Sequence, residues 1–432
     1  MTAIGKACEG VALGRAHLYV CIRCGTSFPF DVHIDSRGCP HCFADAASNL
    51  QVISTGGTRL PGGDTPSLWR YADRLPCEIE KAISLGEGLT PLLRADRLGQ
   101  EFGLDQLYIK DESRNPTWSH KDRFSTVAVS MARLSGARVV ATASSGNAGA
   151  SLAAYAAKGG LDCVVVTFAG IGTPMLAQVR KYGATVLTLA NKADRWPLLQ
   201  KASHELGWFV TSPFHEPAVG SHPAGIAGYK TLAYEIVAQL GGIAPDWCAL
   251  PVCYGDALVG LWQGFAELLE AGEISALPRF IAAEVHGSLG ATLKVDSDVI
   301  VEAPAKFETL AVSIGAKRST YQALAALRAS NGVAVSVDNN HLIALQEELA
   351  RREGILAELA SVTPLSAIAS LKQRGIIARE DKVVAIVTAS GLKDLDRSAE
   401  AAAADPKPFV SVHDAMAWLE GLHRNNYFEM PV

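Results

Sequence analysis

Four cysteines lie in two closely spaced pairs near the start of the chain. Cys21 and Cys24 form one pair, and Cys39 and Cys42 form the other. Each two-residue gap lets two thiolates point at one metal ion, and two such pairs complete a tetrahedral site with no open position. The spacing therefore predicts a structural Zn²⁺ site with four sulfur ligands.

This cysteine segment also admits other interpretations. His33 and His41 lie close by and are possible substitute ligands, although four thiolates already complete the coordination. Four unligated buried cysteines are the plain structural alternative. A zinc ribbon can also bind nucleic acid or a protein partner, but the acidic composition makes that role secondary.

A lysine follows a turn at the start of an expected helix. The segment Asn115–Arg123 reads NPTWSHKDR, in which Asn-Pro-Thr indicates a turn before Lys121. A helix dipole disfavours a positive charge at the N-terminus, which suits an amine that must act as a nucleophile and form a Schiff base. Taken alone, a Lys-Asp-Arg triplet on a helix is more often a solvated face.

A Gly-containing loop, Ser144–Gly149 (SSGNAG), lies between an expected strand and an expected helix. Such a loop presents free backbone N–H groups to an anion, and the two serine hydroxyls and the Asn147 amide add directional donors. The alternative is an ordinary helix N-cap, where Ser and Asn are common. The loop is therefore a candidate anion site.

Strand-like and helix-like segments alternate from about Leu107 onward, which indicates parallel sheets covered on both faces. We therefore expect an α/β fold with a small cysteine-bearing appendage. The expected strands are 138–143, 162–168, 185–189, 248–252, 280–285 and 383–387, and the expected helices include 148–159, 173–182 and 256–271.

The composition limits the classes of function. The chain has 432 residues, of which 49% are hydrophobic and 19% charged, so it can bury a sizeable core. A net charge of −5 offers no basic excess for a nucleic-acid backbone. No apolar stretch reaches the length of a membrane span, and the first residues do not read as a signal peptide. We expect a cytoplasmic protein with neither nucleic-acid nor membrane partners.

Several short motifs in consistent order resemble the pyridoxal-phosphate enzymes of fold type II, and within them the threonine synthases. The resemblance spans roughly residues 20–395, and ordered motifs are more specific together than singly. The matching segments are Ser84–Leu92 (SLGEGLTPL), Asn115–Arg123, Ser144–Gly149, Gly228–Thr231 (GYKT), Glu353–Ala367 and Thr388–Asp394 (TASGLKD).

The resemblance implies an architecture. It predicts two parallel-sheet α/β lobes of fold type II, with pyridoxal 5'-phosphate between them and an N-terminal zinc-ribbon-like appendage. Residues 1–75 would form the ribbon-like region and linker, and residues 76–432 the catalytic domain. A smaller mobile lobe would occupy approximately 112–215. The resemblance also implies a homodimer.

The resemblance assigns roles to residues around the cofactor. Lys121 would bind the cofactor aldehyde as a Schiff base and shuttle protons. Asn147 would hydrogen-bond the cofactor's 3-hydroxyl oxygen. Thr388 would face the pyridine nitrogen, where a neutral hydroxyl gives a milder electron sink than a carboxylate would. The substrate α-carboxylate would bind Ser144, Ser145, Gly146 and Ala148.

The expected phosphate cradle departs from the family's Gly/Asn-rich loop. Only one glycine of that pattern remains, and Asp256 places an acid beside a presumed dianion unless its carboxylate points away. Backbone N–H groups at the helix start can still serve. His120, in place of the usual Phe, is a possible replacement phosphate ligand, and a packed histidine is the alternative. The expected cradle residues are Tyr254, Gly255, Asp256, Ala257 and Leu258.

Two aromatic replacements flank the reactive lysine. Trp118 replaces a Gly and Phe124 replaces a small residue, so both would reshape the pocket if they face the substrate. The alternative is that both pack into the core. Glu358 and Lys230 occupy matched positions, where membership of a surface ion pair is the plainer role.

Three functions remain open from the sequence. The first is a lyase resembling threonine synthase, which converts O-phosphohomoserine and water to threonine and phosphate through Lys121. The second is a pyridoxal-phosphate-dependent ammonia-lyase or β-replacement enzyme acting on a serine-like or diamino acid. The third is a catalytically silent zinc-ribbon binding protein, against which the retention of Lys121, Asn147 and Thr388 argues.

Overall fold

The computed structural model describes residues 16–30, 34–55, 64–144, 146–168, 173–395 and 410–424. The chain divides into two units, Met1–Leu395 and Asp396–Val432. In the second unit, the described element is the helix α15 (Val412–Arg424). No helix in the described part of the chain is long and apolar enough to cross a membrane.

The larger sheet of the first unit has six strands, and only β4 runs antiparallel to its neighbour. Its apolar strands are buried on both faces, as the continuous hydrophobic runs predict. In sheet order they are β12 (Val333–Ser336), β11 (Arg279–Glu284), β10 (Trp247–Pro251), β13 (Lys382–Val387), β5 (Gln106–Asp111) and β4 (Leu92–Arg94).

Alternate residues of these strands pack against two different layers of helices. Cys248 and Leu250 of β10 face one layer, whereas Trp247 and Ala249 face the other. The first layer contains α8 (Lys230–Gln239), α9 (Asp256–Glu270), α10 (Ser288–Lys294) and α11 (Tyr321–Ala329), and the second contains α2 (Asp96–Phe102), α12 (Leu342–Glu353) and α13 (Leu359–Gln373).

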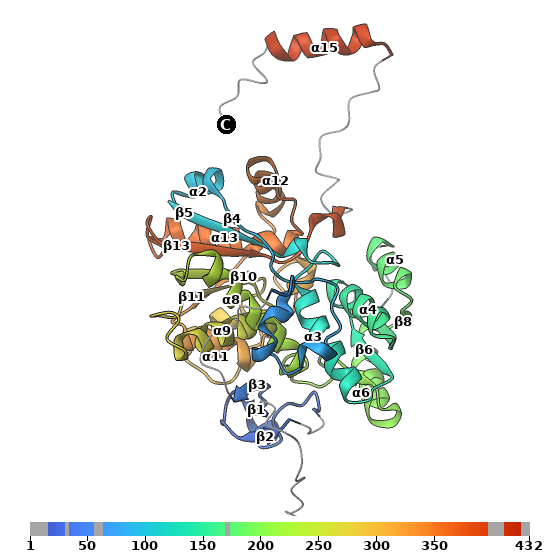
Figure 1. The fold of residues 1–432 in the computed structure, drawn as a ribbon. Helices are drawn as coiled ribbons and strands as arrows, with labels where there is room; N and C mark the ends of the chain where they lie inside the picture. The colour runs from blue at the N-terminus through green and yellow to red at the C-terminus, as the bar shows by residue number, and fades with distance from the viewer. Residues whose placement is uncertain are drawn as a thin grey trace, which may run out of the picture. The chain divides into compact units, whose positions relative to one another are not determined.

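A smaller, fully parallel sheet lies beside this assembly (Figure 1). Its strands, in sheet order, are β8 (Thr185–Leu189), β7 (Asp162–Phe168), β6 (Val139–Ala143) and β9 (Phe209–Val210). Helices cover both of its faces. They are α3 (Lys121–Leu134), α4 (Asn147–Gly159) and α5 (Thr173–Lys181) on one face and α6 (Arg195–Leu206) on the other.

A three-stranded antiparallel sheet carries the cysteines. Its strands are β1 (Ala16–Cys21), β2 (Ser27–Pro29) and β3 (Leu50–Thr55), and the short helix α1 (Phe43–Ala46) follows the second cysteine pair. The side chain of Asn49 donates to the Ser221 carbonyl and to the Gln322 side chain, both at 3.0 Å. The short helix α7 (Pro223–Ile226) follows Ser221.

The α/β prediction is confirmed, and the predicted strands match the observed ones to within a residue or so. Three of the sequence motifs follow the carboxyl ends of strands: Ser144 follows β6, Tyr254 follows β10 and Thr388 follows β13. In open parallel sheets ligands bind at this edge. The fold therefore places the three motifs where a ligand site is expected.

Candidate active site

The segment before Lys121 is hydrogen-bonded to the segment after β13. The backbone N–H of His120 donates to the Thr388 carbonyl (2.8 Å), and the N–H of Ser390 donates to the Trp118 carbonyl (3.1 Å). Helix α3 begins at Lys121 itself. These bonds bring Lys121 and Thr388 together, although the two residues lie far apart along the chain.

His120 lies against Thr388 through its ring as well. Nδ1 is 3.1 Å from the Thr388 carbonyl oxygen and must donate to it, because a carbonyl only accepts. Burial, and then the charge of Lys121, holds the pKa of His120 well below its usual range. The ring is therefore neutral with Nε2 as an acceptor, so the proposed role as a phosphate ligand requires a protonated phosphate oxygen.

Tyr229 lies between Lys121 and helix α9. The Lys121 Nζ is 5.8 Å from the centre of the Tyr229 ring, and His120 stacks on the same ring at 5.4 Å. A Cβ added at Gly260 of α9 would lie 2.5 Å from the Tyr229 Cβ, so the helix packs directly on this residue. The buried Tyr229 hydroxyl has no hydrogen-bond partner among the described residues. Its motif, GYKT, was the sequence signal for this position.

Asn147 reaches across from the small sheet to the same strand end. Its Nδ2 donates to the Glu358 carboxylate (2.6 Å), and the Glu358 backbone N–H donates to the Ala389 carbonyl (3.0 Å). The buried Oδ1 of Asn147 lacks a partner in the described part of the chain. Glu358 is therefore buried at the site and orients the Asn147 amide, so the surface-ion-pair interpretation of this residue is wrong.

The Ser144 hydroxyl organises its own loop. Its Oγ accepts the backbone N–H groups of Gly146 (3.2 Å) and Gly149 (3.0 Å), so it satisfies one first-turn N–H of α4, although the N-cap residue itself is Gly146. Ser145 lies outside the described residues. Gly146 and Ala148 stand at the start of α4, where first-turn N–H groups lack partners within the helix. The role of this loop in carboxylate binding stays a prediction.

The loop between β10 and α9 has the shape of an anion cradle. Gly255 has φ +75°, and a Cβ there would lie 2.4 Å from the Ala323 Cβ, so only glycine fits. The Asp256 carboxylate turns away from the loop and accepts from Ser221 N–H (3.0 Å), Ser221 Oγ (2.6 Å) and Gln322 Nε2 (2.7 Å). The Asp256 carboxylate therefore does not repel an anion bound at the first-turn N–H groups of Asp256, Ala257 and Leu258.

A second lysine, Lys393, lies at the site and was not singled out from the sequence. It is 8% exposed, and its Nζ lacks a hydrogen-bond partner within the described ranges. Burial lowers the pKa of Lys393 to about 8, and the charges of Glu358 and Asp122 oppose that shift. Lys393 lies within the Thr388–Asp394 motif, but the sequence does not show that its amine lies near Glu358 and Asp122.

Asp122 follows the reactive lysine and ties two helices together. Its carboxylate accepts from Thr117 N–H (2.6 Å), Thr117 Oγ1 (2.5 Å) and Ser151 Oγ of α4 (2.6 Å). Burial raises the pKa of Asp122 to about 6, against the lowering effect of these bonds. Thr388 is held in a similar way, since its Oγ1 is 2.8 Å from the Ser361 Oγ.

The two aromatic replacements behave differently. Phe124 is buried in the core, where its ring fills the space beside Gly225. Trp118 is 49% exposed and has φ +64°, the left-handed region in which its counterpart glycine is favoured. Lys230 is fully buried and pairs with Glu267 at 2.8 Å, so its ion pair is a buried one and not on the surface.

The four N-terminal cysteines converge on one point. Cys21 Sγ is 3.8 Å from Cys42 Sγ, and Cys24 Sγ is 3.8 Å from Cys39 Sγ. Sulfurs at ~2.3 Å from one tetrahedral ion lie roughly 3.8 Å apart. The Cys21 sulfur also accepts the N–H groups of Arg23 and Cys24, both at 3.4 Å. His41 contacts Thr26 instead (3.3 Å), and His33 lies outside the described residues.

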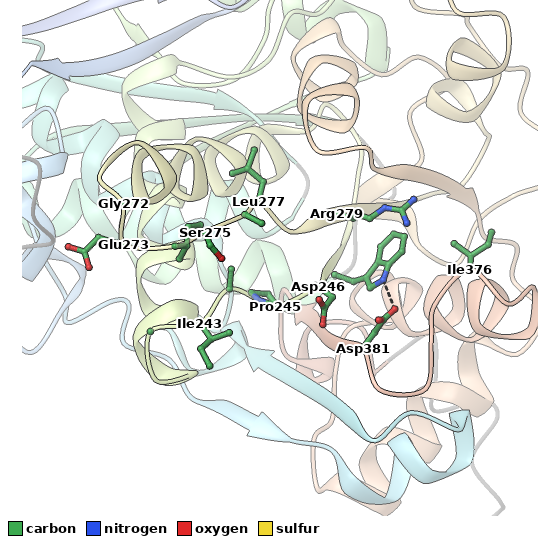
Figure 2. A pocket seen from close by; sticks show the side chains of 15 residues that line it. Ile243, Pro245, Asp246, Gly272, Glu273, Ser275, Leu277, Arg279, Ile376 and Asp381 are labelled. Carbon is green, nitrogen blue, oxygen red and sulfur yellow. Dashed lines mark hydrogen bonds between the residues drawn. The ribbon is translucent and has the colours of Figure 1, made fainter.

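A surface pocket of about 830 Å³ lies elsewhere in the molecule (Figure 2). Its lining includes Asp246 and Trp247 at the start of β10, Arg279 at the start of β11, and Asp381 just before β13. Trp247 donates to Asp381 (2.9 Å), and Arg279 lies over the indole ring at 4.0 Å. These are amino ends of strands, so this pocket lies at the opposite sheet edge from Lys121.

The residues at the carboxyl edge fit pyridoxal phosphate. Asn147 Oδ1 and the Tyr229 hydroxyl are buried polar atoms without partners among the described residues, and the Gly255 turn packs directly on Ala323, so no side chain can stand there. A primary amine, a ring-facing hydroxyl and a loop of N–H groups are the donors that such a cofactor needs. The fold and site thus define a pyridoxal-phosphate enzyme of fold type II.

Comparison with known sequences agrees. Residues 83–389 match the family described as "Pyridoxal-phosphate dependent enzyme". The threonine synthase of Methanocaldococcus jannaschii is 33% identical over 387 residues, covering 88% of this chain and 94% of that protein. The threonine synthase of Methanosarcina acetivorans is 35% identical, covering 87% and 91%. The chain belongs to the pyridoxal-phosphate-dependent enzyme family, as a threonine synthase-like lyase.

Solved structures share the fold at lower identity. The processed form of threonine deaminase isoform 2 from Solanum lycopersicum has a TM-score of 0.61 at 21% identity, covering 80% of this chain and 96% of that one. O-ureido-L-serine synthase has a TM-score of 0.59 at 21% identity, covering 77% and 96%. These likenesses confirm the predicted fold class.

Proposed function

We propose that the enzyme converts O-phosphohomoserine and water to threonine and inorganic phosphate. The observation that carries the proposal is the similarity to two threonine synthases across nearly the whole chain. The site contributes Lys121 beside Thr388, and Asn147 reaching across from the small sheet. These contacts support the proposal.

We assign the cofactor contacts as follows. Lys121 would hold the cofactor aldehyde, Asn147 its 3-hydroxyl oxygen, and Thr388 its ring nitrogen. The phosphate would bind the N–H groups of the 254–258 loop at the start of α9. The start of α4, from Gly146 to Ala148, would bind the substrate carboxylate. The bound cofactor supplies an electron sink for negative charge that develops on the substrate.

Proton transfer falls to Lys121 in this proposal. Its Nζ would take the proton from the substrate Cα and help remove one from Cβ as the phosphate leaves from Cγ, and protons would return to Cγ and Cα when water adds at Cβ. The Thr388 hydroxyl, fixed by Ser361 at 2.8 Å, presents a neutral partner to the ring nitrogen. Glu358 orients Asn147 through the 2.6 Å bond and so keeps its Oδ1 turned to the site.

The leaving phosphate needs positive charge nearby. Lys192 and Arg195 each lie 5.2 Å from the centre of the Phe168 ring, at the carboxyl end of β7. We assign Lys192 and Arg195 to the substrate phosphate. Arg195→Met should raise KM for O-phosphohomoserine while leaving cofactor affinity unchanged; a loss of cofactor affinity instead would place Arg195 at the cofactor phosphate.

A second candidate is elimination or replacement on a serine-like or diamino acid. The exposed Trp118 would favour it if its ring faces the substrate, because a large ring on the segment leading into Lys121 would restrict a long phosphorylated side chain. This reaction uses the same lysine but releases ammonia or exchanges the β-substituent. Product analysis distinguishes this second candidate from the threonine synthase reaction, which yields threonine and phosphate.

The further parts of the proposal concern metal and assembly. We propose that Cys21, Cys24, Cys39 and Cys42 bind one structural Zn²⁺, which the 3.8 Å sulfur spacings support. We also propose a cytoplasmic homodimer, supported by the family resemblance alone. Metal analysis and sedimentation of the purified protein test these two parts.

The functional test is product analysis on cofactor-loaded protein supplied with O-phospho-L-homoserine. We expect phosphate and threonine in equal amounts, and neither from Lys121→Ala. Absence of both products from protein that retains its cofactor would overturn the proposal. Ammonia and an oxo acid from serine or diaminopropionate would then support the second candidate.

A further inference from the structure

Three side chains from three distant segments meet beside the ribbon. Asp35 belongs to the cysteine-bearing region, His204 to the last turn of α6, and His215 to the loop after β9. The Asp35 carboxylate oxygens lie 3.5 Å from His204 Nε2 and 3.4 Å from His215 Nε2. One donor atom from each residue lies within 4.8 Å of the other two. The sequence alone assigns no role to His215.

These contacts are poor hydrogen bonds. An N–H···O bond usually spans 2.7–3.2 Å, and His215 Nε2 is a buried atom without a hydrogen-bond partner in the described part of the chain. A buried nitrogen with no partner is costly, and it needs a group that the side chains do not supply. The His204 and His215 rings face each other with centres 6.4 Å apart.

The donor set suits a metal ion. Two imidazole nitrogens and a carboxylate are common zinc ligands, with bonds of ~2.0–2.2 Å. Ligand atoms at that distance from one tetrahedral ion lie roughly 3.3–3.5 Å apart. Both Asp35–histidine distances fall in this range, with Oδ2 of the carboxylate facing His204 and Oδ1 facing His215.

The surroundings keep the ligands in binding-competent states. Arg37 donates to Asp35 through its backbone N–H (2.9 Å) and its guanidinium (3.0 Å). Burial raises the pKa of Asp35, but the Arg37 bonds outweigh it, so the net shift is downward and the carboxylate stays ionised. Burial lowers the pKa of His215, which favours the neutral imidazole that a metal requires.

We propose that Asp35, His204 and His215 bind a divalent transition-metal ion, with zinc the best fit, separately from the four cysteines. Three protein ligands leave a fourth position to water. The ion would join the ribbon to α6 and the β9 loop, next to the hydrogen bond from Phe214 N–H to Ser36 Oγ (2.8 Å). It would therefore fix the ribbon against the small sheet.

Zinc content per chain tests this proposal. Full-length protein is equilibrated in buffered free Zn²⁺, then treated with a mild chelator and analysed by mass spectrometry. We expect two zinc ions per chain before chelation and one after. His204→Gln, His215→Gln and the near-isosteric Asp35→Asn should each lower the affinity of the second site roughly tenfold or more. His413→Gln, on the exposed surface of α15, is the matched control and should keep both ions.

Cobalt spectroscopy separates the two sites. Co²⁺ in a thiolate site gives intense near-ultraviolet charge transfer, whereas a His/Asp site gives only weak visible bands. The second equivalent of Co²⁺ should add visible bands without new thiolate absorption, and the three variants should lose only those bands. A second zinc that persists in the His204→Gln/His215→Gln double variant, or a wild-type protein that never takes up a second ion, would overturn the proposal.

Discussion

The Thr388 carbonyl accepts two hydrogen bonds from His120, one from the backbone N–H at 2.8 Å and one from ring Nδ1 at 3.1 Å. This pair fixes the end of β13 to the residue that precedes Lys121. It also sets the tautomer of the His120 ring. The backbone around Lys121 and Thr388 is thus positioned by one carbonyl group.

Gly255→Ala should weaken cofactor binding. The new Cβ would lie 2.4 Å from the Ala323 Cβ at a residue with φ +75°, so the cradle loop must shift. Strain of this kind costs about 1–3 kcal/mol, which corresponds to a roughly tenfold or larger rise in the cofactor Kd. Titration of the apoprotein with pyridoxal phosphate measures it.

Gly272→Ala is the matched control for that titration. Gly272 also has a left-handed φ of +71°, but no atom lies within 4 Å of the position that a Cβ would take there. The substitution should lower stability by about 1 kcal/mol and leave the cofactor Kd unchanged. Equal Kd values for the two variants would mean that the 254–258 loop does not hold the cofactor.

The ribbon should influence cofactor affinity through Gln322. This side chain donates to the Tyr254 carbonyl (2.9 Å) and to Asp256 (2.7 Å), and it accepts from Asn49 of the ribbon (3.0 Å). Asn49→Ala removes the last bond, worth ~0.5–1.5 kcal/mol, so the cofactor Kd should rise about two- to tenfold. The same titration checks this value.

Gln51→Ala offers the comparison. Gln51 contacts Gln263 of α9 at 2.8 Å and is not bonded to the cradle loop. Its loss should leave the cofactor Kd unchanged. Removal of the proposed Zn²⁺ from the four cysteines with a chelator should mimic Asn49→Ala, and an unchanged Kd after complete metal removal would contradict this coupling.

Lys393→Met should change how stability depends on pH. The pKa of Lys393 is lowered from 10.5 to about 8, so between these values the unfolded chain binds more protons than the folded one. Wild-type stability should therefore rise with pH across this window, by up to about 3 kcal/mol relative to the variant. Urea unfolding at pH 7.5 and pH 10 measures the difference, and the exposed Lys158→Met serves as control. If the difference in unfolding free energy between wild type and Lys393→Met is the same at both pH values, burial does not lower the pKa of Lys393.

Trp118→Gly should stabilise the protein. The residue has φ +64° and is half exposed, so the variant relieves a left-handed backbone cost of about 1 kcal/mol and loses little packing. Thermal unfolding measures the change. Leu134→Gly, at the exposed end of α3, should have the opposite sign. If both variants destabilise equally, the strain at Trp118 is absent.

Local patterns predicted much of the fold and of the site. Apolar runs marked the strands, because a parallel sheet is buried on both faces. The loops after β6, β10 and β13 could be recognised because each carries its candidate ligand groups within a few residues. The Cys-x2-Cys pairs predicted their own convergence, since each pair is local.

Long-range packing decided what the sequence left open. Phe124 lies in the core because Gly225, far along the chain, leaves room for its ring. Burial lowers the pKa of Lys393 against the opposing charges of Glu358 and Asp122, and no spacing rule connects these residues. Asp35, His204 and His215 likewise come from segments that share no local pattern. Clusters of side chains from distant segments can be identified only from the folded structure.

The most direct measurement identifies the lysine that holds the cofactor. Protein loaded with pyridoxal phosphate is reduced with borohydride, digested and mapped by mass spectrometry. The account predicts the label on Lys121 and its absence from the Lys121→Ala variant, with Lys393 unlabelled in both proteins. A label on Lys393, or on no lysine of this site, would contradict the assignment of the catalytic centre.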